Sequence, residues 1–230
     1  EGEEDAVSLT YVGISEHICE DRDAEGNRTG NGRIRMDMFG GKVGESYSLY
    51  YYAVKGSKTQ NDAYSIELPL QEDSEGNRYF ELKLPIGEYY IGITDSRVVY
   101  NGAHAVVHPL QTIWLGTASS DWNVWENWSE GTPWGCTNVI IPSPTDSKAI
   151  QAYNAEKGAA LTFVQYPILA DEENHCANIH FEPNAQVVNT LNLTYDAAFV
   201  DCMLEGGKEY LWAPPLKEMA TGDWFIGNLI

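Results

Sequence analysis

The sequence predicts an all-β protein in which an antiparallel sandwich is followed by a region of short apolar strands. Hydrophobic and polar residues alternate over short segments, which is the pattern of strands with one buried face. These segments are separated by Gly, Asp, Asn and Pro, which favour tight turns. The first hundred residues contain no convincing helical stripe, so units that alternate strands with helices are not expected.

Five segments of the first hundred residues have this strand pattern. In the first of them, Ile34, Met36 and Met38 fall on one face and charged residues fall on the other. Short strands at this spacing favour two antiparallel sheets packed face to face. We therefore expect one sandwich domain over residues 1–108, with strands at 32–41, 46–54, 63–70, 78–84 and 88–94.

The sequence changes character after AVVHPLQ, and residues 109–230 form the second predicted domain. Short apolar segments separated by Asn, Gly or Pro follow one another as far as residues 210–216, and we expect them to form short strands. Residues 146–158 are an exception. A Ser/Asp cap and a terminal Gly predict a brief helix there.

Five of the seven tryptophans lie between residues 114 and 134. Such a density of aromatic rings predicts either a plug that seals a core or a platform on which sugar rings stack. The candidates for carbohydrate binding are Trp122, Trp125, Trp128 and Trp134. Because polar residues alternate with the first three in a loop-like segment, we favour the plug. A glycan and another surface protein stay open as partners.

The chain carries 34 acidic and 14 basic residues, with a formal net charge of −20. The resulting field repels phosphate backbones and anionic membrane surfaces, so nucleic acid is not an expected partner. No stretch approaches the roughly 20 apolar residues of a membrane-spanning helix, so membrane insertion is not expected. The acidic residues are scattered over turns, which is typical of the surface of an exported protein.

The sequence contains no motif for a nucleophile elbow, a phosphate-binding loop or a zinc protease. We therefore expect no catalytic residues and no enzyme activity. His175 and His180 flank Cys176, and together they offer three metal-binding side chains. On one continuous strand, positions 176 and 180 share a face while 175 faces away, so the three are not expected to converge.

The acidic segment DRDAEGN is the candidate metal site. Asp21, Asp23 and Glu25 alternate as they do at the beginning of a calcium loop. A complete loop requires a bidentate Glu at its twelfth position, where this chain has Gly32. We therefore favour a plain polar turn, keep weakly bound calcium as the alternative, and expect no other cofactor.

The four cysteines, at positions 19, 136, 176 and 202, allow two disulfides in any of three connectivities. None forms a C-x-x-C pair, which argues against a zinc or redox motif. We favour a Cys136–Cys176 disulfide, whose loop of about 40 residues would stabilise the fold by about 4 kcal/mol. Cys19 and Cys202 are expected to be buried free thiols or unrelated cysteines.

A longer order of motifs covers residues 7–100. A cysteine precedes a polar Gly/Asn-rich loop, a G-x-I strand that ends in Gly-Gly, an aromatic strand and a closing L-x-x-G-x-Y segment with Thr-Asp. This order resembles the repeat of gliding-motility adhesins of the SprB type and of many Bacteroidetes surface proteins. The resemblance implies an immunoglobulin-like sandwich that serves as a spacer or adhesive module. Where that family often continues T-D-x-x-G-C, this chain has TDSRVVYNG, so the family's partner for Cys19 is missing. The matching residues are Cys19, Gly32, Ile34, Gly40, Gly41, Leu84, Gly87, Tyr89, Thr94 and Asp95.

A second order of motifs covers residues 112–225. It runs W-x-G-x-x-S-x-D-W-x-x-x-x-N-W, C-T-x-V-x-I-P, Y-P-x-L, C-x-x-I-x-F-x-P and A-P-P-L-K-x-M-x-x-G-D-W, with one insertion at residues 142–163. This order resembles a module of large exported Bacteroidetes proteins. The resemblance implies a tryptophan-rich cap and the first coils of a right-handed parallel β-helix, in which each coil is covered by the next. Representative matching residues are Trp114, Gly116, Ser119, Asp121, Trp122, Asn127, Trp128, Cys136, Thr137, Tyr166, Cys176, Phe181, Tyr195, Ala213, Lys217, Gly222 and Asp223.

Together these features predict a non-catalytic structural or interaction module of an adhesin-like protein at the bacterial cell surface or in the medium. The alternative is the non-catalytic, carbohydrate-binding N-terminal portion of a β-helical carbohydrate-active enzyme. The first residues, EGEEDAV, lack the basic and apolar regions of a signal peptide, and the last, GDWFIGNLI, are apolar. We therefore expect the chain to be a fragment of a longer exported protein.

Overall fold

The computed structural model describes residues 8–56, 63–94, 102–170, 174–202 and 216. It is mostly β, with 45% of residues in strands and 9% in helices, and the all-β prediction is confirmed. The chain forms two compact units. The first comprises Glu1–Gln111 and Glu130–Thr137, and the second comprises Thr112–Ser129 and Asn138–Ile230. We predicted a single boundary after residue 108. Residues 130–137, called the return segment below, nevertheless belong to the first unit.

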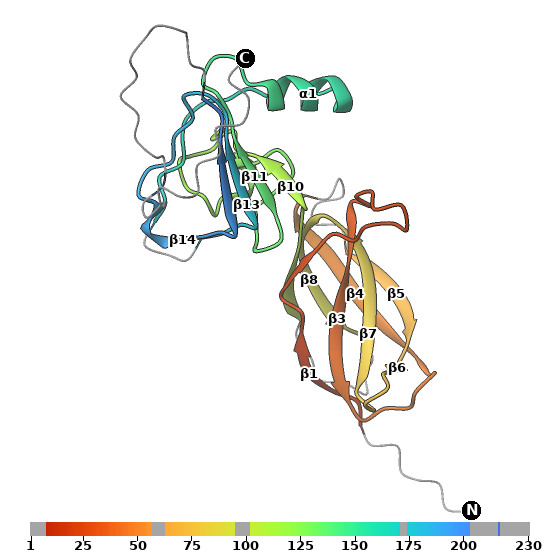
Figure 1. Ribbon diagram of the computed structural model, residues 1–230. Coiled ribbons are helices and arrows are strands. Elements are labelled where there is room, and N and C mark those ends of the chain that lie inside the picture. The colour runs from red at the N-terminus through yellow and green to blue at the C-terminus, as the bar shows by residue number, and fades with distance from the viewer. Residues whose placement is uncertain (1–7, 57–62, 95–101, 171–173, 203–215, 217–230) are drawn as a thin grey trace, which may run out of the picture. The chain divides into compact units, whose positions relative to one another are not determined.

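The first unit contains two sheets, which Figure 1 shows as two layers. The first sheet is antiparallel throughout and has the order β1-β3-β7-β6. Its strands are β1 (Thr10–Ile14), β3 (Asn31–Phe39), β6 (Gln71–Glu72) and β7 (Arg78–Pro85). The second sheet has the order β2-β9-β8-β4-β5 and is antiparallel except for the parallel pair β2 and β9. Its strands are β2 (His17–Cys19), β4 (Ser46–Lys55), β5 (Tyr64–Pro69), β8 (Gly87–Ile93) and β9 (Ala103–His108).

The hydrophobic core of the first unit lies between these two sheets. Ile34, Met36 and Met38 of β3 are buried, as the alternation predicted. They belong to one cluster with Leu49 of β4 and Ile91 of β8, so the two sheets pack face to face. The five predicted strands are confirmed as β3, β4, β5, β7 and β8, each with ends within two residues of the expected ones.

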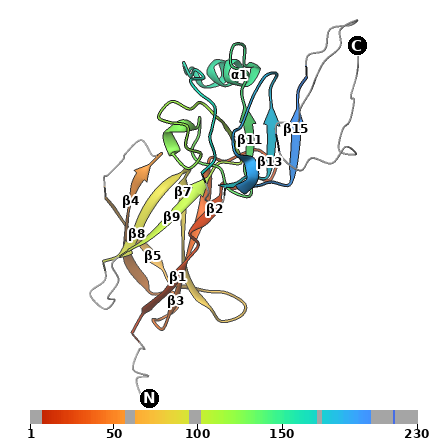
Figure 2. The ribbon, with the colours of Figure 1, turned by 90° about the vertical axis from the view of Figure 1, so that its left-hand side faces the viewer.

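The second unit is built around a sheet with the order β10-β11-β13-β15. Its strands are β10 (Gln111–Ile113), β11 (Asn138–Ile141), β13 (Asn178–Phe181) and β15 (Ala197–Val200). Figure 2 shows β11, β13 and β15 side by side and running in the same direction, and their pairing is parallel. A separate parallel pair is formed by β12 (Asn174–His175) and β14 (Leu193–Thr194).

Two parallel pairings of this unit have the same spacing along the chain. Asn178 of β13 lies opposite Ala197 of β15. The same offset of 19 residues joins Asn174 of β12 to Leu193 of β14. The turn from β11 to β13 is longer, because Asn138 lies opposite Asn178 at an offset of 40 residues.

Side chains of the parallel sheet alternate between a second core and the opposite face. Ile141 of β11 and Ile179 and Phe181 of β13 are fully buried in this core. At the first position of each strand, Asn178 Nδ2 donates to Asn138 Oδ1 at 2.7 Å. A side-chain hydrogen bond therefore joins β11 to β13 in addition to the backbone ladder.

The helix predicted at residues 146–158 is confirmed as α1 (Lys148–Lys157). Ser147 caps it, because its hydroxyl accepts a hydrogen bond from Ile150 N at 3.1 Å. Gly158 ends it in the left-handed conformation, at φ 63°. Ile150 is buried in a small hydrophobic cluster of the second unit, so the insertion adds a covering helix rather than a strand.

Two short 3-10 helices complete the described elements: η1 (Trp125–Asn127) and η2 (Thr190–Asn192). Of the strand expected at residues 210–216, the described part is Leu216, which is buried in the core of the second unit. The rest of that prediction, and the last positions of the tryptophan-rich pattern, lie outside the described residues.

A matched pair of glycine substitutions tests the packing of the first unit. Gly41 and Gly44 both have positive φ, at 69° and 82°, so an alanine at either position carries the same backbone strain. A Cβ at Gly41 would lie 2.7 Å from Leu9 Cδ1 and 2.9 Å from Leu70 Cδ2. A Cβ at Gly44 would have no neighbouring atom within 4 Å. Because both leucines are buried, Gly41→Ala should lower the free energy of unfolding by about 2 kcal/mol more than Gly44→Ala. Equal losses in urea titrations of the two variants would contradict this packing.

Candidate functional site

Three tryptophans, Trp114, Trp122 and Trp128, form a buried triad in the second unit. Trp128 stands edge-on to both others, with ring centroids 4.9 Å from Trp114 and 4.7 Å from Trp122. Trp128 Nε1 donates to Trp122 O at 2.8 Å, and Trp114 Nε1 donates to Gln165 O at 2.6 Å. Edge-to-face aromatic pairs add stabilisation beyond the area they bury, so this tryptophan triad is a structural plug.

Asn127 organises the loop that carries the tryptophan triad. Its side chain is fully buried. Oδ1 accepts from Ala118 N at 2.9 Å and from Ser119 N at 2.8 Å. Nδ2 donates to Ser119 Oγ at 3.0 Å and to Asp121 O at 2.7 Å. All four hydrogen-bonding positions of the amide are therefore occupied, and the Asn of the sequence pattern has a folding role.

The alternative to the plug, a sugar platform of four tryptophans, is not assembled. Trp122 and Trp128 are only 1% and 4% exposed, so neither ring can offer its face to a sugar. Trp134 belongs to the return segment and stacks on His17. Trp125 lies in η1 and is half-buried. The prediction of a four-tryptophan platform is therefore wrong for Trp122 and Trp128, because they contribute to the hydrophobic core.

The candidate calcium loop is a turn closed by its own amides. Asp23 Oδ1 accepts from Asn27 N at 2.7 Å and from Glu25 N at 3.1 Å, while Oδ2 accepts from the Asn27 side chain at 3.1 Å. The Asn27 amides hold the pKa of Asp23 below its usual value. Asp21 faces Arg33 at 3.4 Å instead, and Glu25 is exposed at the tip. The three carboxylates therefore do not converge on one cation site.

The same turn occurs a second time at residues 73–77. Asp73 Oδ1 accepts from Asn77 N at 2.9 Å and from Glu75 N at 3.0 Å, as Asp23 does in the first turn. Gly26 and Gly76 have nearly equal φ values of 87° and 84°. Residues 23–28 and 73–78 share the sequence D-x-E-G-N-R. This repeat indicates the turn, and the prediction from the sequence did not include it.

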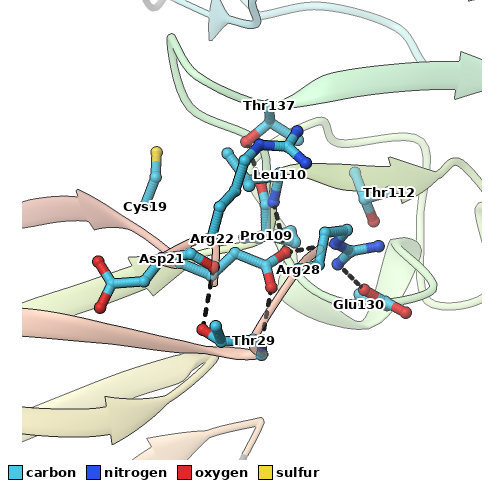
Figure 3. A network of polar contacts seen from close by, with 12 residues as sticks. Cys19, Asp21, Arg22, Arg28, Thr29, Pro109, Leu110, Thr112, Glu130 and Thr137 are labelled. Carbon is cyan, nitrogen blue, oxygen red and sulfur yellow. Dashed lines mark hydrogen bonds and ion pairs between the residues drawn. The ribbon is translucent and has the colours of Figure 1, made fainter. Parts of the chain in front are cut away.

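A buried carboxylate, Glu20, lies at the centre of a polar network in the first unit. Its side chain accepts from Arg28 Nε at 2.6 Å, from Gly30 N at 2.8 Å and from Leu110 N at 2.8 Å. Figure 3 shows Arg28 extending from this network to Glu130 of the return segment. Removing one partner of a buried, hydrogen-bonded charge costs far more than the pair contributes, so this network fixes the local structure.

The return segment is covalently attached to the first unit by a Cys19–Cys136 disulfide. The two Cα atoms are 6.5 Å apart, within the range that a disulfide spans. The predicted Cys136–Cys176 disulfide is wrong, because Cys136 is already bonded and Cys176 is buried in the core of the second unit. The expectation of buried thiols at Cys19 and Cys202 is also wrong, since Cys19 is oxidised and Cys202 is exposed.

Two histidines hold the middle of the return segment. His108 Nδ1 lies 2.8 Å from Thr132 O, and because a carbonyl only accepts, this nitrogen carries the proton. His108 Nε2 then accepts from His17 Nδ1 at 2.9 Å. Trp134 stacks on the His17 ring at 4.0 Å with an angle of 12°. Burial, opposed by the Thr132 carbonyl and reinforced by His17, lowers the pKa of His108 to about 4, so the ring is neutral.

The residues around Cys176 do not form a metal site. Burial raises the pKa of the Cys176 thiol to about 12, whereas His180 faces outward to Asp201 at 3.1 Å. The expectation that positions 176 and 180 share a face is wrong, because β12 and β13 are separate strands and the break between them resets the alternation. Among the residues that the structure describes, no group of three or more His, Cys, Asp or Glu is placed to hold a metal ion.

No protein-family model matches the chain, and no curated protein or solved structure is significantly similar to it. None of the helices in the described part of the chain is long and apolar enough to cross a membrane.

Replacing Asn127 tests its role in the tryptophan-rich loop. Asn127→Ala removes four hydrogen bonds around a fully buried position, so the free energy of unfolding of the second unit should fall by about 3 kcal/mol. Tryptophan fluorescence during urea titration reports the change. Asn123→Ala is the control, since Asn123 is exposed in the same loop and its side chain makes one long hydrogen bond, to Asn174 at 3.4 Å. It should lose about 1 kcal/mol, the value of a single hydrogen bond. A similar loss in both variants would contradict the role of Asn127.

The neutral His108 predicts a loss of stability in mild acid. The folded pKa of about 4 lies below the usual 6.5, so between these values the unfolded chain binds a proton that the folded chain does not. The stabilisation is complete above pH 6.5 and disappears as the pH falls to 4, with a magnitude on the order of 3 kcal/mol. His108→Gln should remove this part of the pH dependence of thermal melting. His104→Gln, on the exposed side of β9, should keep it, and equal pH profiles for wild type and His108→Gln would refute the assignment.

Proposed function

We propose that the chain is a non-catalytic structural or interaction module of an adhesin-like bacterial protein that is secreted or displayed on the cell surface. The observation that carries this proposal is the use of its most distinctive residues in folding. The tryptophan triad, Asn127 and Glu20 are buried, and each fixes a loop or a core. A site that bound a ligand through these residues would instead expose some of their rings or hydrogen-bonding groups.

The proposed architecture is an immunoglobulin-like sandwich followed by the first coils of a right-handed parallel β-helix. Two antiparallel sheets with one shared core support the first part. The second part is supported by the 19-residue offset that β12–β14 and β13–β15 share, and by the Asn138–Asn178 hydrogen bond. The resemblance to SprB-type repeats and to tryptophan-rich modules of exported proteins points the same way.

Export is supported by the chemistry of the chain. Disulfides persist in oxidising environments outside the cytosol, and Cys19–Cys136 is such a bond. A net charge of −20 favours solubility and repels anionic surfaces. Another surface protein or a glycan is the partner class that fits this setting.

Two measurements test the proposal. Antibodies raised against the chain should label intact cells of the bacterium that makes it, or detect the protein in the medium. Labelling that requires cell lysis would contradict export. Trp122→Ala should lower the melting temperature strongly, because a buried tryptophan contributes about 3–5 kcal/mol. Trp125→Ala should lower it less, because Trp125 is only half-buried.

The carbohydrate-binding alternative now depends on Trp125. Calorimetric screening of neutral and acidic glycans against wild type should give no binding if the module is structural. Saturable binding that is retained in Trp122→Phe and lost in Trp125→Ala would favour a carbohydrate-binding portion of an enzyme. The melting temperature of Trp125→Ala shows that such a loss does not come from unfolding.

A further inference from the structure

The Cys19–Cys136 disulfide separates the part of the chain that transmits tension from a part that does not. When the two chain ends are pulled, tension passes along the backbone from the N-terminus to Cys19. The shortest covalent path then crosses the disulfide to Cys136, over 6.5 Å between the Cα atoms. Residues 20–135 form a closed loop beside this path, so no covalent tension passes along their backbone. Within this loop, residues 112–129 belong to the second unit.

The closed loop contains nearly all of the sandwich. Every buried member of the sandwich core except Leu9 lies between residues 20 and 135. The pairings β3-β7-β6 and β9-β8-β4-β5 also lie inside the loop. Pulling can therefore detach β1 and β2, which precede the loop, while both sheets keep their remaining strands and their common core.

Two contacts that hold the return segment also lie inside the closed loop. The ion pair of Arg28 with Glu130 and the hydrogen bond of His108 with Thr132 have both partners inside the loop. No covalent tension reaches these contacts along the backbone, because the loaded path leaves the chain at Cys136 and continues through the disulfide. The non-covalent bonds that position Cys136 are thus preserved while the covalent bond carries the force.

We propose that Cys19–Cys136 is a mechanical lock that keeps the sandwich folded when the chain is under tension. Forced unfolding is governed by the rate at which a loaded structure crosses its barrier, and an unloaded loop gains nothing from the applied force. Its use at a cell surface rests on the proposed function. The lock itself requires only that the Cys19–Cys136 disulfide stays oxidised.

The disulfide sets a measurable difference in the contour length of the chain. The disulfide spans a sequence separation of 117 residues, which would extend to roughly 400 Å once the bond is opened. With the bond closed, the 18 residues before Cys19 can add at most roughly 60 Å from the first unit. The oxidised and reduced chains should therefore differ in contour length by roughly 400 Å.

Optical tweezers test this difference on the full chain. Peptide tags at both ends, joined enzymatically to DNA handles, avoid added cysteines. Each molecule is extended without reductant and again after dithiothreitol, which reduces the disulfide to two thiols and is itself oxidised to a cyclic disulfide. Cys202→Ser is the control that retains the lock, and the double variant Cys19→Ser, Cys136→Ser lacks it.

The expected result is a gain of roughly 400 Å on reduction in wild type and in Cys202→Ser. The double variant should show the long contour without reductant and no change with it. If the double variant does not fold, the reduction of folded wild-type molecules still decides the question. Equal contour lengths before and after reduction would overturn the proposal. This outcome is independent of surface labelling, so failure of the lock and failure of the proposed function can be told apart.

Discussion

The attachment of the return segment to the sandwich is the constraint on which the chain's organisation depends. Residues 111 and 130 both belong to the first unit, so the intervening residues 112–129 start and end there. Fixing both ends of a segment removes much of its conformational freedom before any internal contact forms. Asn127 and the tryptophan triad then order a segment that is already restricted. The disulfide, the Arg28–Glu130 pair and the His108–Thr132 hydrogen bond together maintain this arrangement.

Three buried polar side chains, Glu20, Asn127 and His108, are hydrogen-bonded to backbone groups of other segments. A buried polar group without such partners would be costly. Each of these side chains therefore specifies where a loop lies. This also explains why residues that look functional in the sequence are not free for chemistry, since their lone pairs and protons are already used.

The sequence predicted what is set by local patterns and failed where distant segments meet. Alternation located the strands, and the Ser147 cap and Gly158 located α1. Neither pattern contains information about a disulfide between residues separated by 117 positions. Cys176 and His180 do not share a face for a local reason, because the chain breaks between β12 and β13 where one continuous strand was predicted. The acidic turn was predicted as a turn, but its capping by Asp23 was visible only through the repeat at Asp73.

The two units differ in how far apart in the sequence their paired strands lie. This difference explains where a disulfide stabilises the fold most. In the sandwich, β2 pairs with β9, joining His17 to Val106, so a long loop must close before that contact forms. In the parallel unit, strands pair 19 or 40 residues apart, so each closes a shorter loop on its neighbour. A disulfide stabilises most where the loop it closes is longest, and Cys19–Cys136 contributes about 5 kcal/mol on that basis. Because Cys19 ends β2, the bond reinforces the strand whose pairing has the greatest entropic cost.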